Sequence, residues 1–139
     1  MTGPGGLGKT FLLNAIYARV TGRGFAAMRV TAFHMFETMR RQHVGSDPEF
    51  EGFQALIGAP LLLIDDLGSE PMMRNITVEY LFMLINERMV RGLSTGIATN
   101  LSPAQIQERY GERVFSRLFD RSRGTFIKLE GRDLRQCTM

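Results

Sequence analysis

Hydrophobic and polar positions along the chain follow two alternating patterns. Leu12, Ile16 and Val20 recur every four positions after a glycine-rich start, which is the spacing of an α-helix. The run 61–64 is instead continuously apolar, as in a strand buried on both faces of a sheet. The same patterns predict helices over 11–20, 32–43, 49–57, 76–90 and 112–120, a helix that starts at 103 and breaks near 111, and strands over 25–30, 61–64, 93–99 and 125–129. Strands that alternate with helices indicate an α/β fold with a parallel sheet.

Turn and capping residues mark where these elements begin and end. Thr31 is expected to cap the second helix, and Ser102 with Gln105 forms a capping box. Further signals are Gly22 to Gly24 after the first helix, Asp47 and Pro48 before the third, and Asn75 and Gly92 at the two ends of helix 76–90.

The composition is that of an ordinary globular domain. The 139 residues are 44% hydrophobic and 22% charged, which fits a single domain over 1–139 and excludes disordered and fibrous chains. The apolar stretch 55–64 is interrupted by glycine and proline and is much shorter than the roughly 20 residues that span a bilayer, so no membrane partner is expected. Cys137 is the one cysteine, which favours a cytoplasmic protein. Fifteen of the 17 basic residues are Arg, but a net charge of +3 does not establish nucleic-acid binding.

The glycine-rich start carries the strongest chemical signal. Its eight residues are Gly3, Pro4, Gly5, Gly6, Leu7, Gly8, Lys9 and Thr10, which fit the G-x-x-x-x-G-K-[ST] phosphate loop of nucleoside triphosphatases. In such a loop the glycines let backbone amides converge on phosphate oxygens, Lys9 reaches the β- and γ-phosphates, and the Thr10 hydroxyl binds Mg²⁺. We therefore predict binding of ATP with Mg²⁺; the alternative is a glycine-rich turn without a ligand.

The start of the chain departs from this motif in one respect. A phosphate loop normally follows a buried strand, but only Met1 and Thr2 precede it here. We expect an N-terminally truncated domain whose sheet lacks its first strand, or a sheet that receives this strand from elsewhere.

Polar side chains follow two of the predicted strands. Asp65 and Asp66 come directly after the apolar run, and Asn100 follows the strand that ends at Thr99. Ligands of α/β folds bind at the carboxyl ends of strands, so Asp65 is predicted to hold Mg²⁺ and Asp66 to orient the attacking water. Asn100 could hold that water or contact the γ-phosphate, although Asn is also a common turn residue.

Three arginines recur every four residues near the end of the chain. The spacing of Arg113, Arg117 and Arg121 would place them on one helical face. This pattern fits equally well a solvated face paired with Glu112 and Asp120 or an anion-binding edge.

Four segments in this order resemble a known family: the phosphate loop 2–10, the strand 61–68 that ends in Asp-Asp-Leu-Gly, 98–102 (Ala-Thr-Asn-Leu-Ser) and 111–118 (Gly-Glu-Arg-Val-Phe-Ser-Arg-Leu). Together they are similar to the AAA+ domain of bacterial replicative helicase loaders, the DnaC/DnaI-like family, with the IstB-like transposition ATPases as close relatives. The resemblance implies a P-loop AAA+ αβα sandwich, in which the first strand lies between the fourth and the last.

The resemblance also implies a role for individual residues. Asp66 stands where many AAA+ proteins have Glu, and this shorter side chain predicts slow hydrolysis. The other matches are Lys9 and Thr10 in the phosphate loop, Asp65 at the Mg²⁺ position, Asn100 as the sensor after the fourth strand, Arg117 as the arginine finger that completes a neighbouring subunit's site, and Arg135 as the second sensor.

The function implied by the resemblance is that of an ATP-hydrolysing DNA-replication factor. It would act as a Mg-ATP switch in a ring or helical oligomer on single-stranded DNA, and would bind the replicative helicase through a region that this sequence does not contain. The alternatives are an IstB-like transposition helper ATPase acting on duplex DNA, a small-molecule P-loop kinase, and a fragment without an ordered site.

Overall fold

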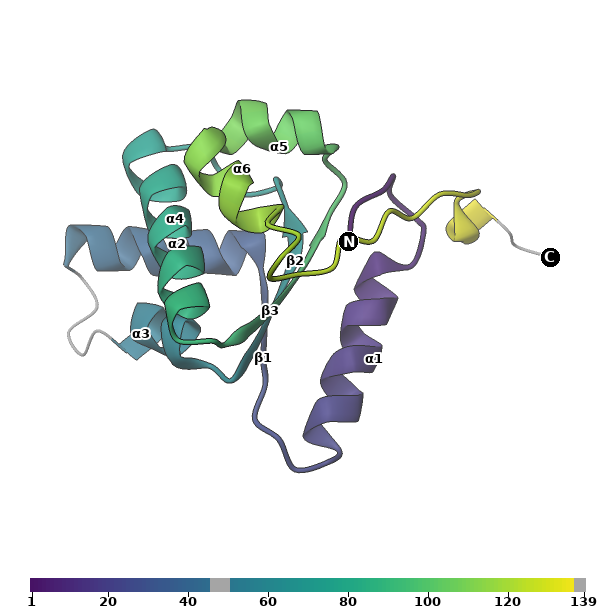
Figure 1. Cartoon of the computed structure of the whole chain (residues 1–139), viewed down its shortest axis with the longest axis horizontal. Coiled ribbons are helices and arrows are strands. Elements are labelled where there is room, and N and C mark those ends of the chain that lie inside the picture. The colour runs from purple at the N-terminus through teal and green to yellow at the C-terminus, as the bar shows by residue number, and fades with distance from the viewer. Residues whose placement is uncertain (46–50, 137–139) are drawn as a thin grey trace.

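A computed structural model describes residues 1–45 and 51–136 of the chain (Figure 1). The strands are β1 (Met28–Thr31), β2 (Leu61–Leu67) and β3 (Ser94–Thr99), which form a parallel sheet in the order β1-β2-β3. The helices are α1 (Lys9–Thr21), α2 (Ala32–Val44), α3 (Glu51–Gly58), α4 (Arg74–Val90), α5 (Pro103–Tyr110) and α6 (Glu112–Leu118), followed by a short 3₁₀ turn, η1 (Leu134–Gln136). The predicted α/β fold with a parallel sheet is confirmed.

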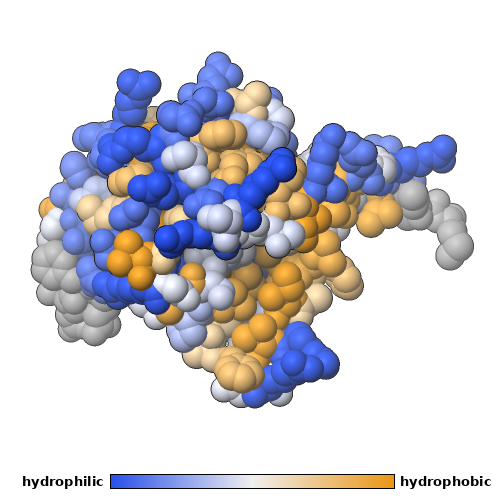
Figure 2. Space-filling view, viewed as in Figure 1, coloured by the Kyte–Doolittle hydropathy of each residue, from blue (hydrophilic) through white to orange (hydrophobic). Residues whose placement is uncertain are grey.

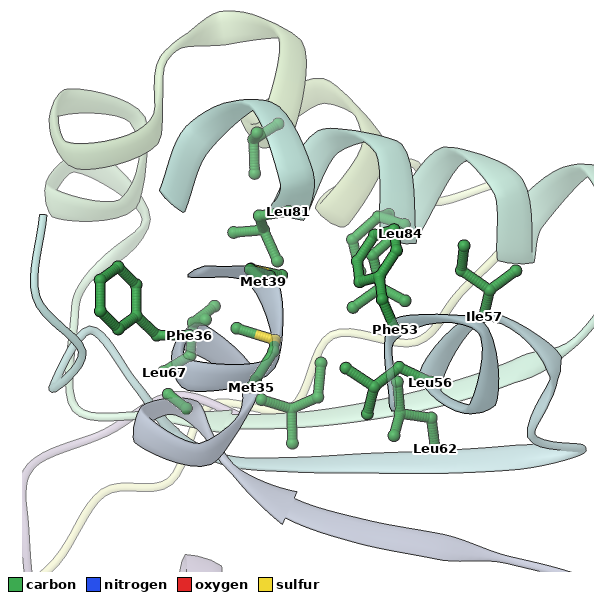
Figure 3. Close-up of a cluster of buried hydrophobic side chains, with 14 of the residues drawn as sticks. Met35, Phe36, Met39, Phe53, Leu56, Ile57, Leu62, Leu67, Leu81 and Leu84 are labelled. Atoms are coloured by element: carbon green, nitrogen blue, oxygen red, sulfur yellow. The ribbon is translucent and has the colours of Figure 1, made fainter. Parts of the chain in front are cut away.

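The helices form two unequal layers. Figure 1 shows α1 alone on one side of the sheet and α2 to α6 on the other. Leu62 of β2 points into the large core beneath α2, α3 and α4 (Figure 3), and Ile64 belongs to the same core. Leu63 instead packs with Leu13 of α1 in a second, smaller cluster. This alternation explains why strand 61–64 is continuously apolar: both of its faces are buried.

Helix α1 is confirmed, but its apolar stripe is not a buried face. Leu12 and Ile16 are 38% and 41% exposed, and Leu13 is the one fully buried apolar side chain of this helix. Figure 2 shows hydrophobic residues gathered over α1. The reason is the layering: α1 contacts the sheet along one line, and no described helix covers its other side.

The first two residues lie beside β3, between this strand and the last segment of the chain. Thr2 bridges Thr99 of β3 on one side and Lys128 on the other, both in parallel orientation. The Thr2 amide donates to the Ile127 carbonyl at 2.9 Å, and the Leu129 amide donates to the Thr2 carbonyl at 2.8 Å. Met1 supplies the hydrogen bonds to β3, from its amino group to the Ile97 carbonyl and from the Thr99 amide to its own carbonyl. Among the described residues, Met1 and Thr2 alone lie between β3 and the last segment, which agrees with the expected sheet that lacks its first strand.

This short contact accounts for one wrong prediction. Segment 125–129 forms an isolated bridge and not a strand, because pairing needs a neighbour along its length and Thr2 provides one residue. Beside it, the edge of β3 faces a groove of about 900 Å³ whose lining includes Ile97, Phe115 and Phe126.

Helix boundaries were predicted with mixed success. The Thr31 side chain caps α2, and the Ser102–Gln105 capping box of α5 is present. The N-cap of α4 is Met73 and not Asn75, because the Thr77 hydroxyl accepts the Met73 amide at 3.0 Å and starts the helix earlier. Helix α6 ends at Leu118, before the predicted 120. Asp47 and Pro48 lie outside the described residues. No helix of the described ranges is long and apolar enough to cross a membrane.

Candidate nucleotide-binding site

The phosphate loop connects Thr2, which lies beside β3, to the start of α1. Gly8 is the residue before α1 and has a φ of 85°, a conformation that favours glycine. Gly6 has a φ of 79°, and a Cβ on it would lie 1.9 Å from Asp133 Oδ1, so no side chain fits there. The 13-residue helix α1 directs its N-terminus at this loop, where backbone amides and the helix dipole favour an anion.

The side chain of Lys9 folds back into the phosphate loop. It is 7% exposed, and its Nζ donates to the carbonyls of Gly3 and Pro4, both at 2.6 Å. Burial lowers the pKa of Lys9, although the charges of Asp66 and Asp65 oppose this shift. A phosphate group beside Nζ would add negative charge next to the buried ammonium group and would thereby stabilise its charged form.

Alkaline pH should therefore weaken phosphate binding while it favours the folded chain. Between the lowered pKa of Lys9 and its ordinary value of 10.5, the unfolded chain holds a proton that the folded chain has released. The contribution of Lys9 to folding stability thus rises with pH in that window. A phosphate bound at Nζ would favour the ammonium form, so its binding should decline. Titrating a fluorescent ATP analogue at a series of alkaline pH values measures this decline. Lys9→Arg keeps its charge and should give a flat profile; an equal decline in this variant would contradict the assignment to Lys9.

Asp65 lies at the carboxyl end of β2 with its side chain on the α1 face. Its Oδ1 accepts the Thr10 hydroxyl at 3.2 Å, and its Oδ2 lies 3.2 Å from Nη2 of Arg29. The hydroxyl and the carboxylate are hard oxygen ligands on adjacent elements, and they fit Mg²⁺. The described residues hold no cluster of three or more His, Cys, Asp or Glu side chains suited to a metal, so phosphate and water would complete the coordination.

Asp66 has different surroundings from its neighbour. The pairing of β2 with β3 is irregular between Ile64 and Leu67, and Asp66 adopts a φ of 58° within this irregularity. Asp tolerates this left-handed conformation better than most residues do. As a result Asp65 is buried and Asp66 is exposed, which leaves the second carboxylate accessible to solvent water.

Asn100 and Arg135 face the same part of the phosphate loop. A Cβ built on Gly5 would lie 3.2 Å from Arg135 Nη2 and 4.0 Å from Asn100 Nδ2. Arg135 also donates from Nε and Nη2 to Asp133, at 3.1 Å each, and the Leu134 amide donates to the Gly6 carbonyl at 2.9 Å. The fold thus brings six predicted residues together around one loop: Lys9, Thr10, Asp65, Asp66, Asn100 and Arg135.

Arg117 lies away from this loop. Its Nε donates to Asn86 Oδ1 at 3.2 Å, and its guanidinium lies 5.8 Å from the ring centre of Phe82, on the α4 side of the sheet. Arg113 stacks on the same ring at 4.0 Å. The predicted three-arginine face is wrong for Arg121, because α6 ends before this residue.

Two buried charged residues, Glu70 and Arg88, were not predicted from the sequence. Glu70 is 3% exposed, and its carboxylate accepts the Gly68 amide at 2.8 Å and the Tyr110 hydroxyl, with Arg109 close by. It thereby ties the loop after Asp66 to α5. Arg88 is fully buried among backbone carbonyls. Both contact residues 30 to 40 positions away, and no local pattern signals such contacts.

Comparison with known proteins identifies the family. The profile of the IstB-like ATP binding proteins matches residues 1–132. The chain belongs to this family. The replicative helicase loader DnaI of Bacillus subtilis (strain 168) is 26% identical over 105 residues, which are 76% of the IstB-like chain and 33% of DnaI. The IstB-like chain therefore spans about a third of that relative.

Solved structures agree on the fold. The crystal structure of the DnaC helicase loader matches with a TM-score of 0.73 at 26% identity, over 93% of the IstB-like chain and 76% of DnaC. Replication initiator DnaA bound to AMPPCP and single-stranded DNA matches with a TM-score of 0.75 at 23% identity, over 94% and 39% of the respective chains. The IstB-like chain accordingly has the P-loop AAA+ fold that the family resemblance implied.

Proposed function

We propose that this IstB-like chain is the ATP-binding and ATP-hydrolysing module of a DNA-replication factor of the helicase-loader type. The observation that carries the proposal is the convergence of Lys9, Thr10 and Asp65 at one edge of the sheet. Asn100 and Arg135 face the same loop from two other segments. A glycine-rich turn without a ligand would not require these charged groups to meet.

Each residue would have a distinct task at this site. Lys9 and the loop amides would bind the β- and γ-phosphates, and Thr10 and Asp65 would hold Mg²⁺. When bound, Mg²⁺ would neutralise negative charge on the phosphates. Asp66 would orient the attacking water, while Asn100 and Arg135 would contact the γ-phosphate. Because Asp66 is one methylene shorter than Glu, we expect slow turnover.

The macromolecular partners are proposed from the relatives. DnaI and DnaC are helicase loaders by name, and one DnaA structure contains single-stranded DNA. By analogy, the IstB-like chain would assemble as a ring or helix on single-stranded DNA and serve a replicative helicase.

Thermal unfolding with and without Mg-ATP tests nucleotide binding. ATP at 100 times its Kd should stabilise the fold by about 2.7 kcal/mol, which raises Tm by roughly 5–10 °C for a chain of this size. Lys9→Ala should reduce the shift to roughly 1 °C, because losing the charged contacts weakens binding by about 100-fold. Lys128→Ala replaces the other lysine of the chain, which is exposed, and should keep the full shift. An unchanged Tm in the parent chain would overturn the proposal.

The second candidate is a transposition helper ATPase, which the match to the IstB-like family favours. It would use the same nucleotide site but act on duplex DNA. Turnover stimulated by single-stranded DNA supports the replication factor, and stimulation by duplex DNA supports the transposition helper.

A further inference from the structure

Arg29 is a charged residue on the edge strand β1, and its side chain extends toward the nucleotide site. Met28 and Val30, its neighbours along the strand, pack against the large core, so Arg29 lies on the opposite, α1 face of the sheet. Leu63 is its partner in the register, and Asp65 follows two residues later on the same face. Arg29 therefore meets Asp65 along the diagonal of two paired strands.

The contact engages the carboxylate from two sides. Arg29 Nη2 lies 3.2 Å from Oδ2 of Asp65, while the Thr10 hydroxyl donates to Oδ1. The Asp65 side chain is only 8% exposed, and a buried carboxylate needs a nearby positive charge. Arg29 supplies this charge through its guanidinium group.

We propose that Arg29 is a positioning residue of the metal site, and that it holds Asp65 toward Thr10 and supplies part of the positive charge that Mg²⁺ would otherwise bring. The proposal rests on the nucleotide-binding function proposed above. Asp66, Lys9 and Arg135 also place charges near the loop. Arg29 differs from these three in its ion pair with the carboxylate assigned to Mg²⁺.

The consequence is a shallow dependence of ATP binding on Mg²⁺. With Arg29 in place, ATP should retain measurable affinity in EDTA, because the site is already partly neutralised. Without the Arg29 charge the site is more negative. Asp65 and Asp66 then repel free ATP more strongly, whereas the Mg²⁺ of Mg-ATP is attracted more strongly. The ratio of the Kd in EDTA to the Kd in excess Mg²⁺ should therefore rise about tenfold in Arg29→Gln.

Equilibrium binding of a fluorescent ATP analogue measures both constants without any turnover. Arg91→Gln is the matched control. Arg91 follows α4 directly and pairs with Glu87 of that helix, at the end of the sheet opposite the phosphate loop. The Kd ratio of this variant should equal that of the parent chain. Arg29→Lys keeps the charge and should stay within about threefold of the parent ratio. A melting curve of Arg29→Gln shows whether that variant folds. If it does not fold, Arg29→Lys still tests the proposal.

The outcomes separate this inference from the proposed function. The role of Arg29 alone is overturned if the parent chain binds ATP and the Kd ratio is unchanged or lower in Arg29→Gln. A tenfold change of that ratio in Arg29→Lys overturns it as well. Absence of ATP binding by the parent chain in both conditions overturns the nucleotide site itself.

Discussion

Arg117→Ala is expected to lower ATP turnover by about 10³–10⁵-fold and to leave ATP affinity nearly unchanged. An arginine finger stabilises negative charge on the phosphates in the transition state, and the loss of one has effects of this size in other nucleoside triphosphatases. Helix α6 packs on α4, on the side of the sheet away from α1. Arg117 therefore lies away from the phosphate loop of its own chain, and under the proposed function it would serve the site of a neighbouring subunit.

Mixing two inactive variants provides the decisive measurement. Arg117→Ala keeps an intact phosphate loop, and Lys9→Ala keeps the finger. If the finger acts between subunits, the mixture should recover part of the turnover that each variant lacks. Arg113→Ala is the matched control, because Arg113 stacks on the same Phe82 ring, and this variant should retain most turnover. Full turnover by Arg117→Ala alone would instead indicate a self-contained site, as in a small-molecule kinase.

Arg88→Ala should cost about 3–5 kcal/mol of folding free energy. Arg88 is fully buried, and burial lowers its pKa to about 10, so it remains charged at neutral pH. Within residues 1–45 and 51–136, no carboxylate forms an ion pair with it. Its Nη1 donates to the carbonyls of Leu56, Ile57 and Ala59 at 2.7–3.0 Å, and its Nη2 donates to that of Ser94 at 2.6 Å. The Ala variant removes this donor from four carbonyls, of which those of Leu56, Ile57 and Ala59 are buried.

Thermal unfolding followed by circular dichroism measures this loss, which corresponds to a Tm lower by roughly 10–20 °C. Arg88→Lys should fall between the parent and the Ala variant, since one ammonium group cannot replace the several directed donors of a guanidinium. Arg91→Ala changes a half-exposed arginine beside the same helix and should alter stability by less than about 1 kcal/mol. If Arg88→Ala melts within 2 °C of the parent chain, Arg88 does not stabilise the end of α3.

Much of the candidate site could be predicted because its signals are local. The phosphate loop is one continuous segment, and Asp65 and Asn100 each follow a strand recognisable from its apolar residues. In a parallel sheet the carboxyl ends of adjacent strands lie at one edge, so the meeting of Thr10 with Asp65 followed from topology. The family resemblance extended the prediction to Arg135, which the structure places at the same loop.

The failures have equally specific causes. The strand predicted over 125–129 lacks a neighbour, and the stripe of Leu12 and Ile16 has no helix to cover it. Each error came from a segment whose own pattern was correct but whose partner is not among the described elements. The prediction that Arg121 shares a helical face with Arg113 and Arg117 was wrong for a simpler reason, since α6 ends before this residue.

Local patterning alone thus established the order of helices and strands, the phosphate loop and the carboxylates at the strand ends. These features depend on residues within a few positions of one another. The tertiary structure decided which charges meet: Arg29 with Asp65, Arg88 with the end of α3, and Glu70 with Tyr110. Those pairs are separated by about 30 to 40 residues, and they form only when packing of the apolar core brings their elements into contact.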